Sequence, residues 1–306
     1  MAKFSIDILG CGSATPTDKH LPSSQVVDFR DRLMMIDCGE GAQLQFKRMH
    51  LKFPRLGHIF ISHLHGDHFL GLPGLLSTLA LHDTGGSIVI HTFKEGVDIL
   101  QKIMAVFCRE TSFEIIYDVI EPGHGVILDD HALTVETFPL YHRVPAVGFL
   151  FKEKPKPRHL KGDLVRFLDI PVSQLPLIKE GADFVKADGT VVPNALITSD
   201  PEPSISYAYC SDTAFNPSIA ENIAGVDTLY HEATYLQDSE LKAGQRGHST
   251  AAQAGQIATL AGAKRLILGH YSKTYKGQDE LFAAEAATTF SGEIIAAREG
   301  MKIDLI

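Results

Sequence analysis

The residues best suited to chemistry stand together in the run Ile59-Phe-Ile-Ser-His-Leu-His-Gly-Asp-His68. Its last six positions hold three imidazoles and one carboxylate, at His63, His65, Asp67 and His68. Ligand groups at this density are stable when a cation neutralises and orients them, and imidazole with carboxylate suits Zn²⁺. The run therefore predicts a metal site within a single loop.

The apolar stretch before His63 is typical of a buried strand, so the loop begins where that strand ends. Side chains alternate along a strand, which places His63 and His65 on one side and lets Asp67 and His68 turn towards a neighbouring position. One loop can therefore serve two adjacent metals. A polar surface loop with incidental histidines is the alternative, and it leaves the density of ligands unexplained.

A two-metal site needs more ligands than this loop contains, because each Zn²⁺ takes several protein ligands and keeps one position open for water. The candidates each follow a strand-like segment later in the chain: His142, Asp212 and His270. A lone histidine at a strand end is usually structural. These three follow the loop in the order His, Asp, His, and this joint order favours a role in the metal site.

Short apolar runs alternate with helical patterns, which is typical of an α/β protein. We predict strands at 4–9, 33–36, 58–62, 87–91, 113–120, 133–138, 206–210, 228–231 and 265–269. We predict helices near 41–50, 68–81, 95–106, 216–223, 249–261 and 278–290, and a Ser249 or His248 cap for the fifth. Each half contains an apolar strand that runs into a histidine. We therefore expect two sheets packed face to face, helices outside, and the active residues at one shared edge.

Composition limits the classes of function. With 306 residues and 44% hydrophobic content, the chain can form one sizeable domain or two small ones. The net charge of −9 argues against general affinity for nucleic acid, so an RNA substrate would need a local basic patch, and DNA is not expected. Four scattered cysteines predict reduced thiols in a cytoplasmic protein. We find no signal peptide and no apolar run that could span a bilayer, and expect no membrane partner.

The segment 152–203 does not fit the core pattern, because it is rich in proline and lacks periodicity. We predict an insertion that stands away from the body. Its first part is basic and contains Lys152, Lys154, Lys156, Arg158, Lys161 and Arg166. Contact with phosphates is the functional interpretation, and a solvated linker whose lysines contact nothing is the alternative.

Several motifs carry a resemblance to a known family. The run Asp37-Cys-Gly-Glu-Gly41, the histidine loop, Ser211-Asp212-Thr213 and Gly269-His270 resemble the metallo-β-lactamase superfamily. Within it, the chain resembles the ribonuclease Z family of tRNA 3′-processing endonucleases, over nearly its whole length. The specific motifs are Gly10-Cys-Gly-Ser-Ala-Thr-Pro16, Gly39-Glu-Gly-Ala-Gln43, Leu70-Gly-Leu-Pro-Gly-Leu-Leu76, His231-Glu-Ala-Thr-Tyr235 and Gly247-His-Ser-Thr-Ala251.

The resemblance implies a fold. It is the metallo-β-lactamase fold, an αββα sandwich of two mixed sheets flanked by helices. We expect residues 1–306 to form a single domain of this kind, in which 152–203 is an inserted flexible arm and a tRNA-binding exosite. The family's usual Gly-Pro element of the arm is absent, and Leu168-Asp-Ile-Pro-Val-Ser-Gln-Leu-Pro176 takes its place.

The resemblance also implies roles for site residues, with two Zn²⁺ per subunit. One Zn²⁺ would be held by His63, His65 and His142, the other by Asp67, His68 and His270, and Asp212 would bridge them. Asp37 would support the histidine loop through hydrogen bonds. His248, oriented by Glu232, would protonate the leaving group, while Asp67 would also orient the attacking water. A surface ion pair is the plain alternative for Glu232 and His248.

The implied activity is a zinc-dependent endoribonuclease that removes the 3′ trailer from precursor tRNA, leaving a 3′-hydroxyl on the tRNA and a 5′-phosphate on the trailer. A homodimer would let one subunit hold the tRNA while the other cuts it. The basic arm residues Lys152, Lys154, Lys156, Arg158 and Lys161 would contact RNA. Lys273 stands where many relatives carry arginine, so it would meet a phosphate as a point charge.

Other classes of function remain as alternatives. A small-substrate hydrolase, such as a phosphodiesterase or thioesterase, would use the same ligands without the basic arm, Glu232 or His248. A non-catalytic RNA-binding descendant would be expected to lack ligands, and a diiron redox enzyme to carry a carboxylate in place of His65. A dinucleotide site at Gly10 and Gly12 is excluded, since Thr15 replaces the third glycine and Pro16 follows.

Overall fold

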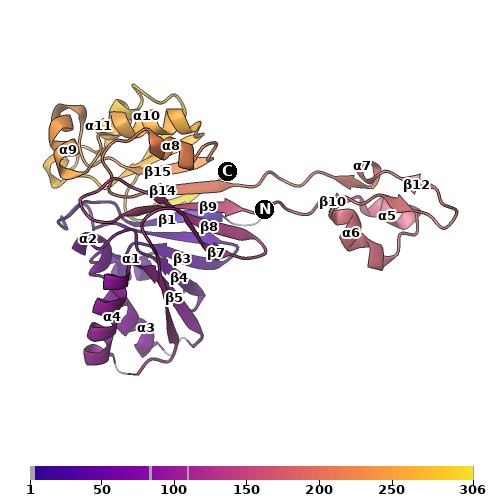
Figure 1. The fold of residues 1–306 in the computed structure, drawn as a ribbon, viewed down its shortest axis with the longest axis horizontal. Helices are drawn as coiled ribbons and strands as arrows, with labels where there is room; N and C mark the ends of the chain where they lie inside the picture. The colour runs from indigo at the N-terminus through magenta and orange to yellow at the C-terminus, as the bar shows by residue number, and fades with distance from the viewer. Residues whose placement is uncertain (1–3, 83–84, 109, 306) are drawn as a thin grey trace.

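Two seven-stranded sheets form the body of the computed structural model, which describes residues 4–82, 85–108 and 110–305. The sheets pack face to face with helices on both outer sides (Figure 1). Both sheets mix parallel and antiparallel pairs. The predicted α/β class and the αββα sandwich are confirmed.

The first sheet comes mainly from the first half of the chain. Its strands lie in the order β18 (Lys302–Asp304), β1 (Phe4–Gly10), β2 (Ser24–Phe29), β3 (Arg32–Ile36), β4 (Leu56–Phe60), β5 (Ser87–Thr92) and β6 (Glu114–Val119). Strands β3 to β6 are parallel, so their carboxyl ends share one edge. Its helices are α1 (Ala42–Arg48), α2 (Gly66–Phe69), α3 (Leu72–Leu81) and α4 (Lys94–Phe107).

The second sheet comes from the second half. Its order is β17 (Glu293–Ala296), β16 (Arg265–Gly269), β15 (Thr228–Glu232), β14 (Ser206–Cys210), β9 (Val147–Glu153), β8 (Leu133–Pro139) and β7 (Gly125–Asp129). Its helices are α8 (Ser218–Asn222), α9 (Glu240–Arg246), α10 (Ala251–Ala261) and α11 (Asp279–Ala286). Short 3₁₀ turns occupy Phe53–Arg55, Val172–Gln174, Gln237–Ser239 and Lys273–Tyr275.

Apolar side chains from the two sheets meet in the centre of the sandwich. Phe60 on β4 lies 5.4 Å, between ring centroids, from Phe149 and 5.6 Å from Phe151, both on β9. All three rings are fully buried. A second apolar cluster fills the space between the first sheet and its helices, and includes Phe46 and Leu75. These two layers hold the strand ends in fixed positions.

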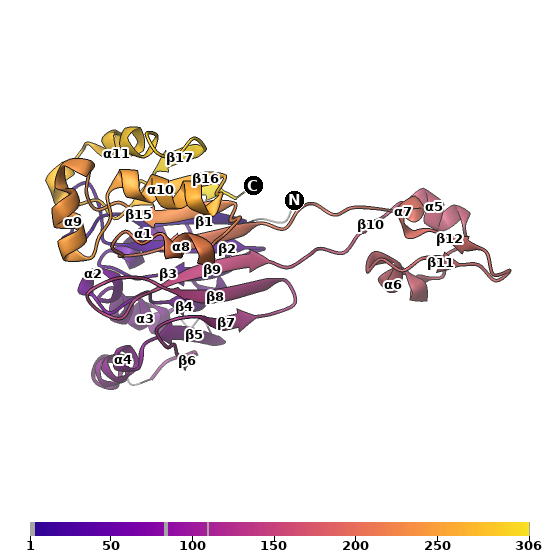
Figure 2. The ribbon, with the colours of Figure 1, turned by 45° about the horizontal axis from the view of Figure 1, so that its top comes forward.

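The segment between β9 and β14 leaves the body and forms a projecting arm (Figures 1 and 2). It contains β10 (His159–Leu160), α5 (Gly162–Phe167), α6 (Leu175–Lys179), β11 (Phe184–Val185), β12 (Val191–Val192), α7 (Asn194–Ile197) and β13 (Thr198–Ser199). Ile170, Ile178, Phe184 and Ile197 form a small core of its own. The arm therefore has secondary structure and an apolar core of its own.

Some local predictions were wrong. The predicted helix 68–81 is two helices, because the chain turns at Leu70 and Gly71 before Pro73 in the first turn of α3. The helix predicted from 249 begins at Ala251, and its cap is Thr250, which forms a capping box with Gln253. Strands β2, β7, β9, β17 and β18 of the body, and the four short strands of the arm, were not predicted. No helix within the described residues is long and apolar enough to cross a membrane.

Candidate metal centre

The predicted ligands gather at one end of the sandwich, where strands of both sheets end. His63 and His65 lie in the loop after β4, and Asp67 and His68 lie on α2. Three further residues follow strands of the second sheet: His142 follows β8, Asp212 follows β14 and His270 follows β16. The structure therefore brings together seven residues from four separate segments of the chain.

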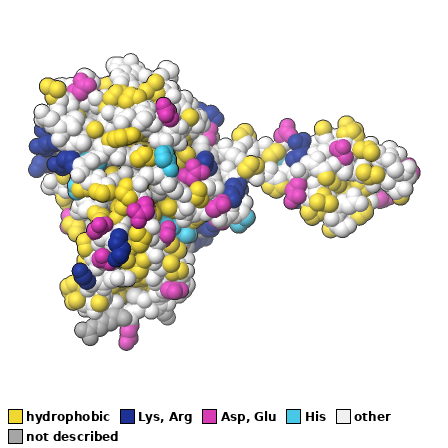
Figure 3. Space-filling view, in the orientation of Figure 1, with side chains coloured by type: hydrophobic (Ala, Val, Ile, Leu, Met, Phe, Trp, Pro, Cys, Tyr) yellow, Lys and Arg dark blue, Asp and Glu magenta, His cyan; other side chains and the backbone are white. Residues whose placement is uncertain are grey.

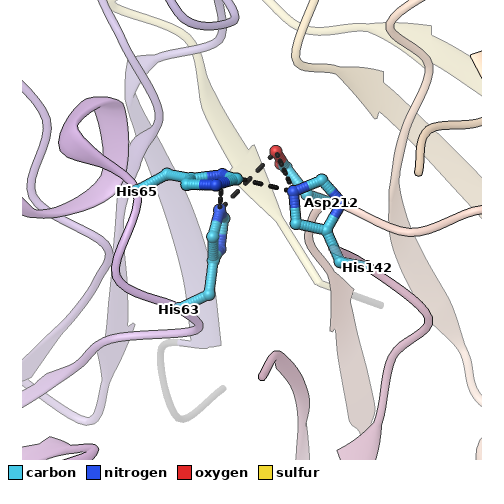
Figure 4. A group of neighbouring side chains, drawn as sticks. All are labelled: His63, His65, His142 and Asp212. Atoms are coloured by element: carbon cyan, nitrogen blue, oxygen red, sulfur yellow. Dashed lines mark hydrogen bonds and ion pairs between the residues drawn. The ribbon is translucent and has the colours of Figure 1, made fainter. Parts of the chain in front are cut away.

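The first group contains three histidines and one oxygen of Asp212 (Figure 4). His65 Nδ1 lies 3.1 Å from His63 Nε2 and 3.2 Å from His142 Nε2. Asp212 Oδ2 lies 3.6 Å from His63 Nε2 and 3.8 Å from His142 Nε2. Four potential ligand atoms thus surround one point.

The second group contains Asp67, His68 and His270, and it uses the other oxygen of Asp212. His68 Nε2 lies 3.3 Å from His270 Nε2. Asp67 Oδ2 lies 3.5 Å from both of these nitrogens. Asp212 Oδ1 lies 3.3 Å from His68 Nε2 and 3.1 Å from His270 Nε2. Asp212 therefore presents one oxygen to each group.

This donor set fits two neighbouring divalent cations. Imidazole nitrogens face one another at hydrogen-bond distance, and Asp212 Oδ1 is buried without a hydrogen bond. Burial lowers the pKa of His63, His65 and His142, so these rings are neutral near pH 7 and can offer a lone pair. Carboxylate and imidazole ligands in groups of this size suit zinc.

Asp37 fixes the loop from behind. Its fully buried carboxylate accepts hydrogen bonds from the Ser62 amide, the Ser62 hydroxyl, His68 Nδ1 and the Tyr209 hydroxyl, each at 2.8 Å. Gly71 lets α3 approach the Asp37-Cys-Gly-Glu-Gly segment, since a Cβ there would lie 2.1 Å from the Gly39 carbonyl oxygen. Asp37 therefore connects the histidine loop to His68 and Tyr209 through hydrogen bonds.

Two other histidines are oriented through their second ring nitrogen. His142 Nδ1 donates to the Gly247 carbonyl at 2.7 Å. His270 Nδ1 donates to the Thr234 hydroxyl at 2.8 Å, and that hydroxyl donates to Glu232 Oε2 at 2.7 Å. These hydrogen bonds leave each Nε2 facing the centre. Sequence reasoning missed Ser62, Tyr209 and Thr234, although Ser62 and Thr234 stand inside the motifs quoted above.

Glu232 and His248 form a buried pair beside the two groups. Glu232 is fully buried, so the surface ion pair that was the alternative is wrong. Its Oε1 accepts from His248 Nδ1 at 2.9 Å, and its Oε2 accepts from the Thr234 amide at 2.8 Å. Burial lowers the pKa of His248, but Glu232 and Asp212 raise it more, to about 9. The ring is therefore positively charged near pH 7.

A pocket of about 440 Å³ opens onto the centre, and His65, Asp67, Asp212, His248 and His270 are among its lining residues. Its rim carries Arg143, Arg246 and Lys273. Among the described residues, none of these three cations forms an ion pair with a carboxylate. Figure 3 shows Lys and Arg side chains gathered over the end of the body near α9. Lys273 was predicted here, while Arg143 and Arg246 were not.

The other predicted RNA contacts lie away from the pocket: Lys152 is on β9 and Lys154 and Lys156 follow it, whereas Arg158 and Lys161 flank β10 in the arm. All have partners: Lys152 pairs with Glu136, Lys154 with Asp129, Lys156 with Glu153 and Arg158 with Asp200, while Lys161 donates to the Ala195 and Leu196 carbonyls. Segment 152–203 has eight basic and eight acidic residues. Its exposed apolar side chains are Phe167, Val172, Leu177, Val185, Val191 and Leu196.

Comparisons with known proteins agree with this geometry. A family model described as Anti-Pycsar protein Apyc1 matches residues 4–155, and one described as Beta-lactamase superfamily domain matches residues 196–271. Ribonuclease Z of Parabacteroides distasonis is 49% identical over 306 residues and covers 100% of both chains. Ribonuclease Z of Porphyromonas gingivalis is 49% identical over 307 residues, with 100% of both chains covered.

A solved structure is also similar. The crystal structure of human tRNase Z, short form, matches with a TM-score of 0.70 and 25% identity over 99% of both chains. The sandwich and the histidine–aspartate centre define a hydrolase of the metallo-β-lactamase fold. Within that class, the chain belongs to the ribonuclease Z family.

Proposed function

We propose that this chain is a zinc-dependent endoribonuclease that cleaves the 3′ trailer from precursor tRNA. Membership of the ribonuclease Z family supports this substrate. The observation that carries the reaction is the pair of ligand groups that share Asp212, beside a charged His248 in a pocket with a cationic rim. A phosphodiester has both the negative charge and the poor leaving group that such a site can serve.

We assign one Zn²⁺ to His63, His65 and His142 and the other to Asp67, His68 and His270, with Asp212 as the shared ligand. When bound, the two cations supply an activated water and neutralise charge at phosphorus. Asp67, whose Oδ2 faces His68 and His270, also orients the attacking water. Arg143, Arg246 and Lys273 hold the phosphates that flank the scissile one.

His248 supplies the proton for the leaving group. Attack at phosphorus forms a new P–O bond and breaks the bond to the ribose 3′ oxygen of the tRNA. His248 Nδ1 is held by Glu232, so Nε2 is the nitrogen that can give its proton to that oxygen. The products are a tRNA with a 3′-hydroxyl and a trailer with a 5′-phosphate.

The arm, 152–203, holds tRNA away from the cut. It projects from the end of the body opposite to α2, so an arm reaches a substrate in a partner's pocket more easily than one in its own (Figure 2). We therefore assign a homodimer in which Lys152, Lys154, Lys156, Arg158 and Lys161 lie near RNA held by the arm. The free cysteines suit a reducing, cytoplasmic setting.

The test is cleavage of a 3′-extended precursor tRNA by the purified, zinc-loaded protein, with the products mapped at single-nucleotide resolution. We expect one cut at the end of the acceptor stem and its loss in His65→Ala. A small diester, bis(p-nitrophenyl) phosphate, is assayed in parallel. Turnover of that diester without cleavage of the precursor would refute the tRNA assignment and favour a small-substrate hydrolase.

A further inference from the structure

A buried cluster outside the metal centre lies beneath one wall of the pocket. Its members are Cys11, His20, Asp279 and Glu299, which come from both ends of the chain. Each is at least partly buried, and Cys11 and His20 are 0% and 8% exposed. The reaction proposed above uses none of these side chains.

His20 lies between two carboxylates. Its Nδ1 is 3.0 Å from Glu299 Oε2, and its Nε2 is 3.1 Å from Asp279 Oδ1. The side chain of Asp279 also faces Arg298, at 3.4 Å, and the Tyr271 ring lies 5.5 Å from the imidazole. Hydrogen bonding to Glu299 raises the pKa of His20, although burial opposes this. A doubly protonated ring can donate to both carboxylates at once.

The loop above this cluster, Gly12 to His20, forms part of the pocket wall. Its base is closed by the Gly12 amide, which donates to the Leu21 carbonyl at 2.9 Å. At its tip, the Ala14 amide donates to Asp67 Oδ2 at 2.7 Å. That oxygen is the one that faces His68 and His270 in the second ligand group.

The backbone of Ala14 is strained in this position. Its φ is +50°, in the left-handed region that alanine rarely adopts. Such a conformation persists only when its surroundings impose it, and it is common at functional sites. The imposing contacts on this loop are the hydrogen bond from Ser13 N to the Tyr271 carbonyl, at 3.1 Å, and the buried His20 at its base.

The cluster could instead be a third metal site, because its thiol, imidazole and carboxylate lie within reach of one cation. Hydrogen bonds, however, already satisfy its groups. Glu299 Oε1 accepts from the Leu21 amide at 2.8 Å, and Cys11 Sγ donates to the Ala297 carbonyl at 3.3 Å. In the metal centre, by contrast, imidazole nitrogens face one another. An ion-paired histidine therefore accounts for the cluster more simply.

We propose that His20 is a positioning residue: bound by Asp279 and Glu299, it clamps the Gly12–His20 loop so that the Ala14 amide orients Asp67. This inference rests on the proposed function, since it assigns His20 to the same centre. The chain of contacts runs from Glu299, through the loop, to a single oxygen of the second ligand group. Loss of the contacts of His20 should therefore lower the zinc affinity of the second ligand group more than that of the first.

The test compares His20→Gln with wild type and with His131→Gln, an exposed histidine outside the site. Zinc affinity is measured by competition with a chelator, and kcat and KM are measured on precursor tRNA. We expect His20→Gln to weaken one of two zinc sites by roughly 10–100-fold. We expect kcat to fall while KM stays near wild type, and no change in His131→Gln.

Nuclear magnetic resonance of wild type tests the clamp without a variant. Both ring nitrogens of His20 should carry protons at pH 7, and a neutral ring would overturn the proposal. Two further outcomes would do so: unchanged zinc affinity in His20→Gln, or three bound zinc ions in wild type and two in the variant. If wild type does not cut precursor tRNA, the proposed function fails, while the zinc titration still decides the role of His20.

Discussion

Asp37 shows how one residue can fix several ligands. It occupies the left-handed backbone region, with φ of +55°, and its carboxylate accepts four hydrogen bonds. We predict that Asp37→Asn lowers zinc affinity by roughly 10–100-fold, because an amide nitrogen cannot accept from the groups that now donate to it. The measurement is zinc titration against a chelator.

Asp31→Asn is the matched control for this change. Asp31 is also a left-handed aspartate, with φ of +66°, but its side chain is 65% exposed. Its replacement should leave zinc affinity unchanged. Equal losses in the two variants would show that the loss in Asp37→Asn does not come from the hydrogen bonds of Asp37.

The Glu232–His248 pair makes a prediction about pH. In the proposed reaction His248 acts as an acid in its protonated form, so turnover should fall as pH rises through its pKa, which Glu232 helps to raise to about 9. Glu232→Gln removes that charge and lowers the pKa of His248. The alkaline limb of the kcat profile should therefore move to lower pH. If Glu232→Gln keeps its zinc and the alkaline limb of its kcat profile does not move, His248 is not the acid.

At the scale of elements, the arm can be removed cleanly. β9 and β14 are antiparallel neighbours with Lys152 opposite Ser206, so residues 155–203 can be replaced by an Asn-Gly turn. We predict that the shortened enzyme binds precursor tRNA roughly 10²-fold more weakly, since it loses a second contact site. Turnover of bis(p-nitrophenyl) phosphate should be unchanged. Equal loss of both activities would contradict a role for the arm in RNA binding.

Elements with a clear pattern were predictable from the sequence. All nine predicted strands are present, and in all of them except β6 the apolar run is largely buried. β2, Ser-Gln-Val-Val-Asp-Phe, was missed because its polar residues are buried as well. β18 is only three residues long and exists through its pairing with β1, which is a contact between the two ends of the chain. Such pairings depend on tertiary structure, which local patterns do not encode.

The candidate metal ligands were predictable from the sequence, but the charged residues around them were not. Each of the seven candidate ligands had a motif or a strand end to mark it, and the structure brings all seven together. Arg143 and Arg246 had no such signal, because a single exposed arginine resembles any other. The partners of Lys152 and Lys154 could not be predicted either, because they come from other strands: Glu136 lies on β8, which pairs with β9, and Asp129 lies on β7, the next strand beyond β8.

At the scale of the molecule, the metal centre joins the two sheets. The histidine loop follows β4 of the first sheet, whereas Asp212 and His270 follow strands of the second. Cations that bind only the folded state stabilise it by about 2.7 kcal/mol per site at one hundred times Kd. We predict that a chelator lowers the thermal midpoint and that added zinc restores it. If the chelator does not change the thermal midpoint, the purified protein holds no metal at this centre.

The homodimer can be tested by mixing subunits. The arm-deleted variant keeps the pocket, and His65→Ala keeps the arm. If one subunit holds the tRNA that its partner cuts, mixed dimers recover activity, to about one quarter of wild type when assembly is random. Each variant alone should be inactive on low concentrations of precursor tRNA. Absence of recovery after confirmed exchange of subunits would contradict this arrangement.

The paired charges of the arm have a consequence for ionic strength. Contacts with phosphates release counterions and weaken steeply in salt, whereas apolar contacts do not. The arm balances its acids and bases and exposes apolar side chains, while the unpaired cations surround the pocket. As the salt concentration rises, the acceptor stem should therefore dissociate from the pocket before the distant part of the tRNA dissociates from the arm. At high ionic strength the enzyme would then still bind tRNA that it no longer cuts.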